Sequence, residues 1–308
     1  AFIPPEVNKT NNILTKKESN PIDFFIENKL NENGLTFSEP AIKERLIRRV
    51  YFDLTGLPPS IEDVNNFKND ESPKAYEKII DKLLASEENA ERLTMDWLDL
   101  SRYADSHGLH ADGLRTMWPW RDWVINAFKN NMPYDEFVTK QLAGDLLTNP
   151  SRQDIIPTAF NRNTPMTAEG GVVDEEWRLN YVFDRTETFG TAFLGLTVMC
   201  AKCHDHKFDP ISQRDYYELA AFFNQTKELG MTGDDGDFGP LLLLPEPNKE
   251  KTLNKIQEQI SYKKKQLELK QNELFEIYSY VDQLNEKNNL ESIERSIIQN
   301  VSFETLKP

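Results

Sequence analysis

Apolar residues recur at intervals of three and four through most of the first 225 positions, which is the spacing of one face of an α-helix. Few stretches alternate apolar and polar residues as a half-buried strand does. Ser, Pro and Gly residues flank the helical runs and mark where helices begin and end. The pattern predicts a mainly α, irregular multi-helix domain, with helices over residues 21–33, 41–56, 61–69, 73–84, 86–104, 119–130, 133–147, 153–161, 174–199 and 213–225.

Residues that cap helices indicate more closely where some of these predicted helices begin. Ser38 is placed to cap the second helix, and Pro73 stands at the first position of the fourth. Ser60 and Ser212 each precede an aspartate by three positions, which is the arrangement of a capping box. The long helix over 174–199 is expected to run directly into the two cysteines of the chain. Three segments lack the helical pattern and are predicted to be loops, the last with at most one short strand: 105–117, 167–174 and 230–247.

The C-terminal part of the chain has a different pattern. From residue 248 to about 285, apolar residues alternate three and four apart, with Lys263 and Lys270 in the two remaining seam positions, which is a heptad repeat. The segment 285–289 is a candidate turn into a second helix that ends near residue 300. An antiparallel helical hairpin is therefore predicted, and the seam over 253–284 would also suit a coiled-coil partner from another chain. A solvated hairpin without chemistry is the simpler interpretation.

These patterns divide the chain into four segments. No apolar run approaches the roughly 20 residues that a membrane-spanning helix needs. The segments are an N-terminal extended segment over 1–18, a helical domain over 19–247, a heptad-patterned hairpin over 248–300, and the start of a linker or following domain over 301–308.

The charge balance of the chain argues against one class of binding partner. Fifty-one acidic residues against 36 basic ones leave a formal charge of −15 on 308 residues. A surface this acidic repels phosphate backbones, so nucleic acid is not expected as a partner.

The cysteines carry the clearest chemical signal. The chain has only two, and they lie in the motif CAKCH, in which His204 directly follows Cys200 and Cys203 at the C-x-x-C spacing. This is the signature of covalent haem attachment: two thiols one turn apart face the haem vinyl groups, and the adjacent imidazole binds the iron. Thioether formation requires an oxidising compartment, so the motif predicts one covalent haem c and a periplasmic or secreted protein.

Two other interpretations of the motif stay open. The two cysteines with His204 and His206 could form a zinc site, although two histidines from one turn close a tetrahedron poorly. A redox-active C-x-x-C disulfide is the other, but the βαβ pattern that accompanies such motifs is missing.

The sixth iron ligand is less well defined by the sequence. His107 is the first candidate and His110 the second, because two of the four histidines fall in the predicted loop 105–117. Two histidine ligands predict a low-potential electron carrier, a methionine ligand raises the potential, and an open sixth site permits peroxide chemistry. The methionine candidates are Met95, Met117, Met132, Met166 and Met231.

Two polar clusters accompany the motif. Arg115 and Trp118 belong to an aromatic and basic cluster that could bind haem propionates and wall a haem pocket, with core packing as the alternative. Acidic residues around 169–176 and 234–237 make calcium a minor candidate, although neither group has the spacing of an EF-hand.

Several stretches together resemble one known family. The chain is similar to the planctomycete-type cytochrome c domain family, which is found in large extracytoplasmic multidomain proteins with a single C-x-x-C-H motif in an all-helical block. The resemblance covers about residues 19–230 and implies haem at Cys200, Cys203 and His204. Residues 305–308 resemble the start of the domain that follows in this family, which implies that the chain is part of a longer protein. The matching stretches are NPIDFFI at 20–26, RRVYFDLTGLPP at 48–59, WLDLSRYAD at 97–105, WPWRDWVINAF at 118–128, YDEFVTKQLAGD at 134–145, FNRN at 160–163, EGGVVDEE at 169–176 and CAKCHDHKFDPISQRDYY at 200–217.

Three functions are compatible with these observations. The leading one is electron transfer outside the cytoplasm, between this haem and a redox partner protein or a neighbouring cytochrome module. The second is a haem enzyme that acts on peroxide or another small oxidant at an open sixth site. The third is a non-catalytic scaffold with a structural haem, which docks partners through the heptad segment.

Overall fold

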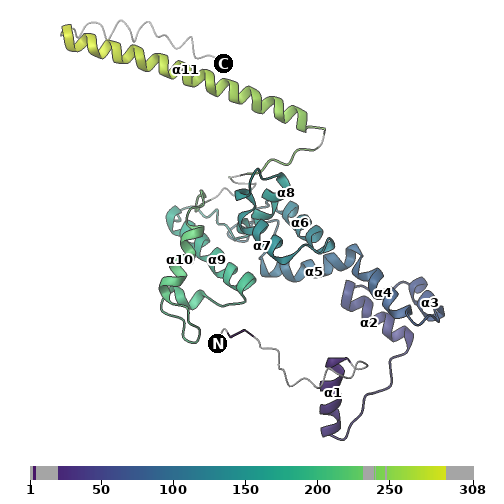
Figure 1. The fold of residues 1–308 in the computed structure, drawn as a ribbon. Helices are drawn as coiled ribbons and strands as arrows, with labels where there is room; N and C mark the ends of the chain where they lie inside the picture. The colour runs from purple at the N-terminus through teal and green to yellow at the C-terminus, as the bar shows by residue number, and fades with distance from the viewer. Residues whose placement is uncertain (1–2, 5–19, 232–238, 240, 247, 289–308) are drawn as a thin grey trace. The chain divides into compact units, whose positions relative to one another are not determined.

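The computed structural model of the chain describes residues 3–4, 20–231, 239, 241–246 and 248–288. This part of the chain is mainly helical, as predicted, and its only β-type pairing consists of three isolated bridges. The chain divides into two compact units, residues 1–241 and residues 242–308 (Figure 1). No helix in the described ranges is both long and apolar enough to cross a membrane.

The first unit contains ten α-helices in its described part, with three short 3₁₀ segments between some of the later ones. Their bounds are α1 Pro21–Glu32, α2 Lys43–Thr55, α3 Ile61–Asn69, α4 Ala75–Leu84, α5 Glu87–Leu100, α6 Trp118–Lys129, α7 Tyr134–Ala143, α8 Arg152–Ile155, α9 Asp174–Leu194 and α10 Gln213–Phe223, with 3₁₀ segments η2 Gly144–Leu146, η3 Ile156–Arg162 and η4 Met199–Lys202.

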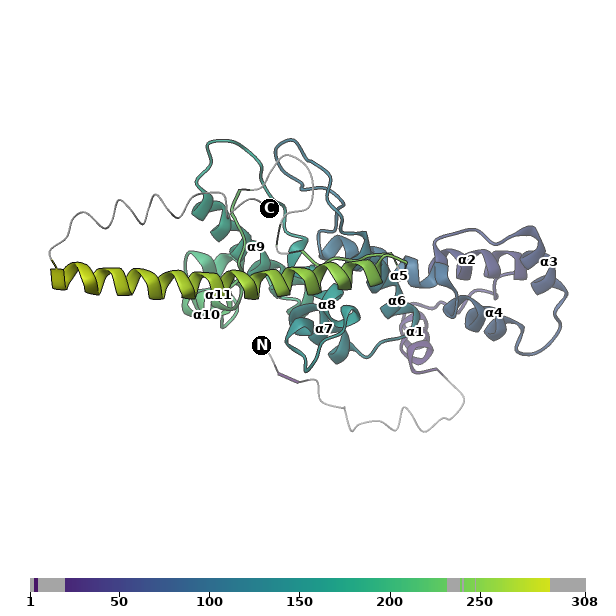
Figure 2. The same cartoon turned by 90° about the horizontal axis from the view of Figure 1, so that it is seen from above.

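Helices α2, α3 and α4 form a small bundle at one end of this unit (Figures 1 and 2). Its core consists of Ile47, Val50 and Tyr51 from α2 with Phe67 from α3 and Leu83 from α4, each at most 9% exposed. These residues occupy the apolar faces that the three-and-four spacing predicts, so burying them fixes how the three helices pack.

One ion cluster ties the start of α3 to α4. Ser60 caps α3 by accepting a hydrogen bond from the backbone N–H of Asp63 at 3.0 Å, as predicted. The Asp63 carboxylate accepts hydrogen bonds from Lys82 Nζ at 2.8 Å and from the Ser60 hydroxyl at 2.6 Å. These donors, Lys82 first, lower the pKa of Asp63 to about 2.

We expect Asp63→Asn to destabilise the first unit in a pH-dependent way. A carboxyl whose pKa is lower in the folded state stabilises the fold above its ordinary pKa of 3.8, and this contribution is lost as the pH falls towards 2. Because a quarter of the side chain is exposed, we discount the effect to about 1 kcal/mol at pH 7. Thermal unfolding should show this deficit at pH 7 and little difference between the proteins near pH 2.5. Asp81→Asn, at an exposed position of α4, is the control, and equal behaviour of the two variants at both pH values would contradict the expectation.

The main core is aromatic and lies where α5, α6, α7 and η3 meet. Trp97 of α5 packs edge-on against Phe137 of α7 with ring centroids 5.1 Å apart, and stacks on Phe160 of η3 at 6.1 Å. Trp120 and Trp123 of α6 complete the cluster and are 1% and 7% exposed. Rings of this size bury large apolar areas, so this cluster contributes strongly to holding the central helices together.

Several predicted boundaries are wrong: α5 ends at Leu100 instead of at residue 104, and α7 ends at Ala143 instead of at residue 147. Helix α2 begins at Lys43 and has no side-chain cap, so Ser38 does not cap it. Helix α4 begins at Ala75 instead of at Pro73, because a turn precedes it. Helix α9 ends at Leu194 instead of running to residue 199, because Gly195 adopts φ 64° in the left-handed region and closes the helix.

The second unit is dominated by a single helix, α11, from Glu250 to Asn288. It covers the heptad-patterned segment and continues through most of the candidate turn at 285–289. The second helix of the predicted hairpin, near residues 290–300, lies outside the described residues, as does most of the predicted extended segment 1–18.

Candidate functional site

The end of α9 positions the segment that carries the cysteines. After the left-handed Gly195, the chain turns back and Val198 packs against Gly190 of α9. A Cβ atom at residue 190 would lie 2.8 Å from a Val198 methyl group, so only glycine permits this close approach. The cysteines therefore stand on a separate turn that is braced against α9.

Both cysteines lie at the surface of this turn. Cys200 is in η4 and Cys203 directly follows it, and both thiols are free and exposed. The backbone N–H groups of Cys203 and His204 both donate to the carbonyl of Cys200, at 3.3 and 3.4 Å. Ala201, between the cysteines, is fully buried. The tight turn thus presents two thiols and the following imidazole together.

The hydrogen bond of His204 fixes which ring nitrogen is available. Its Nδ1 lies 2.8 Å from the backbone carbonyl of Asp205, at an exposed position. A carbonyl oxygen only accepts hydrogen bonds, so Nδ1 carries the proton and the neutral ring keeps an unprotonated Nε2. This is the arrangement found in metal-binding histidines, in which the second nitrogen donates to a backbone carbonyl and the first binds the metal.

Helix α10 holds the turn from its other side. Tyr216, which is 1% exposed, packs with Val198 and Ala201, and Tyr217 donates from its hydroxyl to the carbonyl of Lys202 at 3.1 Å. Asp205 accepts from the first backbone N–H of α10, that of Gln213, at 2.7 Å. The Ser212–Asp215 capping box at this helix start is present as predicted. The turn that carries the motif is therefore held against α10, whereas its two thiols are exposed to solvent.

Large apolar side chains near the motif are exposed. Met199 is 60% exposed, Phe208 is 83% exposed and Tyr217 is 45% exposed. Solvated apolar groups of this size favour contact with another apolar surface. These exposed side chains could therefore contact an apolar group held at Cys200 and Cys203.

His206 is engaged within its own turn. Its Nδ1 accepts the backbone N–H of Asp209 at 2.9 Å, and its side chain is 8% exposed. Among the described residues, no group of three or more His, Cys, Asp or Glu side chains gathers closely enough to hold a metal ion. The geometry thus gives His206 a structural role and does not favour the zinc interpretation.

The two loop histidines have different environments. His107 is 3% exposed, its backbone N–H donates to Gly113 at 2.9 Å, and its carbonyl accepts from Met166 at 2.8 Å. His110 is exposed and has φ 58°. The loop 105–117 is present as predicted. Neither histidine is tested as an iron ligand by these contacts, so both stay predictions.

Arg115 fastens this loop to the chain after η3. Its Nη1 donates to the carbonyls of Arg162 at 3.1 Å and Thr164 at 3.0 Å, and Nη2 donates to the carbonyl of Asn163 at 3.3 Å. Burial first, and then the charge of the nearby Arg162, lower the pKa of Arg115 to about 10. Arg115 thus has a structural role whether or not it also binds a propionate. Trp118, at the start of α6, is half exposed.

One buried cluster of ion pairs was not predicted from the sequence. Glu228 accepts from Arg162 Nη1 at 2.8 Å and pairs with Arg185 of α9, and the Glu228 and Arg185 side chains are 5% and 2% exposed. Burial lowers the pKa of Arg185, while Glu228 opposes this shift. Nothing in the local pattern around residue 228 marks it, because its partners are distant in sequence.

The first acidic segment considered for calcium, around 169–176, has other contacts. Asp174 accepts the backbone N–H groups of Gly230 and Met231 at 2.9 and 3.0 Å, and Glu175 pairs with Arg178 at 2.7 Å. The second acidic segment, 234–237, lies outside the described residues. Calcium binding therefore gains no support from the described contacts.

The first unit matches one family model. The PSCyt2 model, described as a protein of unknown function (DUF1549), matches residues 21–228, about two thirds of the chain. No curated protein and no solved structure matches significantly. The matched range includes helices α1 to α10 and the CAKCH turn, and it ends before α11.

Proposed function

We propose that this chain, which belongs to the PSCyt2 family, is a c-type cytochrome domain that transfers electrons outside the cytoplasm. The family match agrees with the family predicted from the sequence motifs, and its name points to a cytochrome-related domain. The match covers the whole helical unit that carries the CAKCH turn. What we propose beyond the family is the covalent haem, the location of the protein outside the cytoplasm and its role in electron transfer.

The hydrogen bond from His204 to the Asp205 carbonyl is the observation that carries this proposal. In the neutral ring it leaves Nε2 unprotonated, at an exposed position of the turn that also carries two exposed free thiols. An ordinary surface histidine needs no fixed tautomer, whereas a proximal haem ligand does. The same turn therefore offers both the thioether sulfurs and the axial nitrogen.

The residues around the motif would position the group in defined ways. Cys200 and Cys203 would hold it through thioether bonds, and His204 would bind the iron through Nε2. The side chains of Met199 and Tyr217, which are exposed, would contact its apolar surface. The bound haem would supply reversible one-electron chemistry. Because thioether formation belongs to oxidising compartments, a periplasmic or secreted location follows from the proposal.

An electron-transfer protein is expected to have a low-spin iron in both redox states. We predict that the loaded protein cycles between oxidised and dithionite-reduced low-spin spectra and shows no peroxide turnover. His107→Ala is expected to convert the spectrum to high spin if His107 is the sixth ligand, and His110→Ala is the matched control within the same loop. The reverse result would assign the ligand to His110 instead.

A different outcome would favour another function. A high-spin spectrum with peroxide turnover in the unsubstituted protein would contradict electron transfer and favour a haem enzyme with an open sixth site. If the spectra were unchanged in both histidine variants, neither loop histidine would be the sixth iron ligand, and the methionines would be the next candidates. Met166 is buried beside His107, whereas Met95 is exposed.

A further inference from the structure

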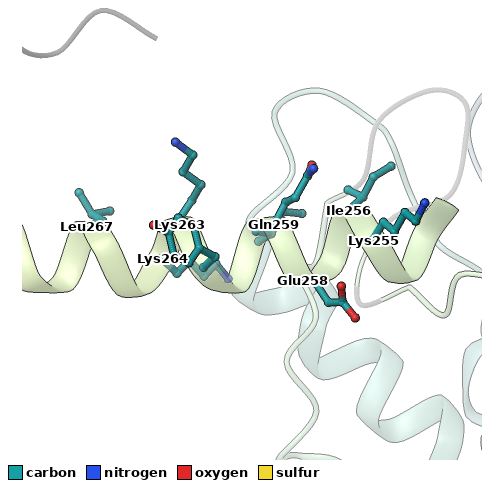
Figure 3. Close-up of a pocket in the computed structure, with 9 residues that line it drawn as sticks. Lys255, Ile256, Glu258, Gln259, Lys263, Lys264 and Leu267 are labelled. Atoms are coloured by element: carbon teal, nitrogen blue, oxygen red, sulfur yellow. The ribbon is translucent and has the colours of Figure 1, made fainter. Parts of the chain in front are cut away.

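Helix α11 presents a row of large apolar side chains to solvent. Ile260, Leu267 and Ile277 are 49%, 57% and 51% exposed, although burying side chains of this kind is energetically favourable. Figure 3 shows Ile256, Lys263 and Leu267 projecting to one side of the helix and Glu258 to the other. A helix of 39 residues is about 58 Å long. It therefore offers a long apolar stripe to a partner.

The shape of this face suits another helix better than a small ligand. A hollow of about 940 Å³ runs along residues 255–267, and its described lining residues all belong to α11. The described wall comes from one helix, and a small molecule held by that wall alone would remain largely solvated. A second helix can instead insert its side chains between those of the seam, as in a coiled coil. We define the seam by its heptad positions Leu253, Ile256, Ile260, Lys263, Leu267, Lys270, Leu274, Ile277, Val281 and Leu284.

Charge is distributed unevenly along the helix. Residues 255–265 contain four lysines and one glutamate, a net charge of +3, whereas residues 266–286 contain five acids and one lysine, a net charge of −4. Two parallel copies would place like charges side by side over both halves. Two antiparallel copies would place the basic half of each opposite the acidic half of the other, which favours that orientation.

The seam lysines point to the same orientation. In a parallel pair, Lys263 would face Lys263 and Lys270 would face Lys270, giving two layers of like charge. In an antiparallel pair centred between residues 268 and 269, Lys263 lies opposite Leu274 and Lys270 lies opposite Leu267. Every layer then combines positions a and d of the heptad. Each lysine can pack its stem on a leucine while its ammonium reaches solvent.

We propose that α11 pairs with α11 of a second copy of this chain in an antiparallel coiled coil. The remaining layers of this register are apolar, since Ile260 lies opposite Ile277 and Ile256 lies opposite Val281. This pairing uses no residue of the CAKCH turn and does not depend on haem.

The oligomeric state of the full chain tests the pairing. Sedimentation velocity from 1 to 100 µM should show a species of twice the 35.7 kDa chain mass that dissociates on dilution. Ile260→Asp buries two carboxylates in the seam and is expected to weaken the dimer at least 100-fold. Tyr262→Asp makes the same kind of change at a 61% exposed position outside the seam and should leave the dimer intact. A monomer throughout, as when another segment of the same chain covers the seam, would overturn the proposal, and so would equal behaviour of the two variants.

The orientation is tested by a distance between the two copies. A spin label at Glu258→Cys, with Cys200→Ala and Cys203→Ala to remove the native thiols, places one label on the outer face of each α11. In the antiparallel register the other label is level with residue 279, an offset of about 32 Å along the axis. A parallel pair has no offset along the axis, so its labels are separated only across the two helices, and a label separation shorter than the axial offset of about 32 Å would overturn the antiparallel arrangement.

Discussion

Replacing Cys200 and Cys203 together with alanine is expected to abolish covalent haem. Both thiols are exposed and free, so neither contributes to packing, and the variant should fold as the parent does. Without a thiol no thioether bond can form, whatever else binds the haem. After expression with a cytochrome c maturation system, haem that survives protein denaturation should fall from about one per chain to none. A haem-stained denaturing gel and the intact mass measure this directly.

A matched control separates attachment from general disturbance of the turn. Lys207→Ala, at an exposed position just beyond the motif, should retain full covalent loading. His204→Ala is expected to keep the thioether bonds wherever maturation succeeds, but to lose the spectrum of an axially ligated iron. Equal covalent loading in the double cysteine variant and the parent would show that the haem, if present, is attached elsewhere.

Replacing Glu228 with glutamine is expected to cost about 3–5 kcal/mol of unfolding free energy. Glu228 is the carboxylate that compensates Arg185, whose side chain is 2% exposed, and it also binds Arg162. Glutamine keeps the size of the side chain but leaves a buried guanidinium without its counter-charge, which costs far more than the loss of an exposed pair. Urea unfolding followed by circular dichroism at pH 7 measures the difference.

The control for this variant is an ion pair of the same type at the surface. Glu218→Gln removes the partner of Arg214 in α10, where both side chains are more than half exposed. Its expected effect is below about 1 kcal/mol. If both glutamine variants lost similar stability, the buried cluster would not hold α9 to the segment after α10.

Local signals in the sequence predicted most of the helices. Ser60, Ser86 and Ser212 all cap helices through their side chains, and each is followed by a helix with an apolar face. The helix before the cysteines was predicted too long, although Gly195 carried the stop signal. The apolar residues that follow it continued the helical spacing and concealed that signal.

Interactions between distant residues could not be predicted in this way. Glu228 lies 43 positions from Arg185 and 66 from Arg162, and a periodicity argument contains no information about such pairs. The motif at 200–204 could be recognised in the sequence because its three functional residues lie within five consecutive positions. The proton position on His204 was not readable, since it depends on the turn that brings the Asp205 carbonyl to the ring.

The pyridine haemochrome spectrum of the purified chain tests the central claim most directly. The protein is expressed with a cytochrome c maturation system, extracted with acidified acetone to remove any non-covalent haem, and reduced in alkaline pyridine. We predict a c-type haemochrome band equivalent to one haem per chain, which means that both vinyl groups are saturated by Cys200 and Cys203. A protein that carries no haem after extraction, while a control cytochrome matures in the same cells, would contradict the proposal.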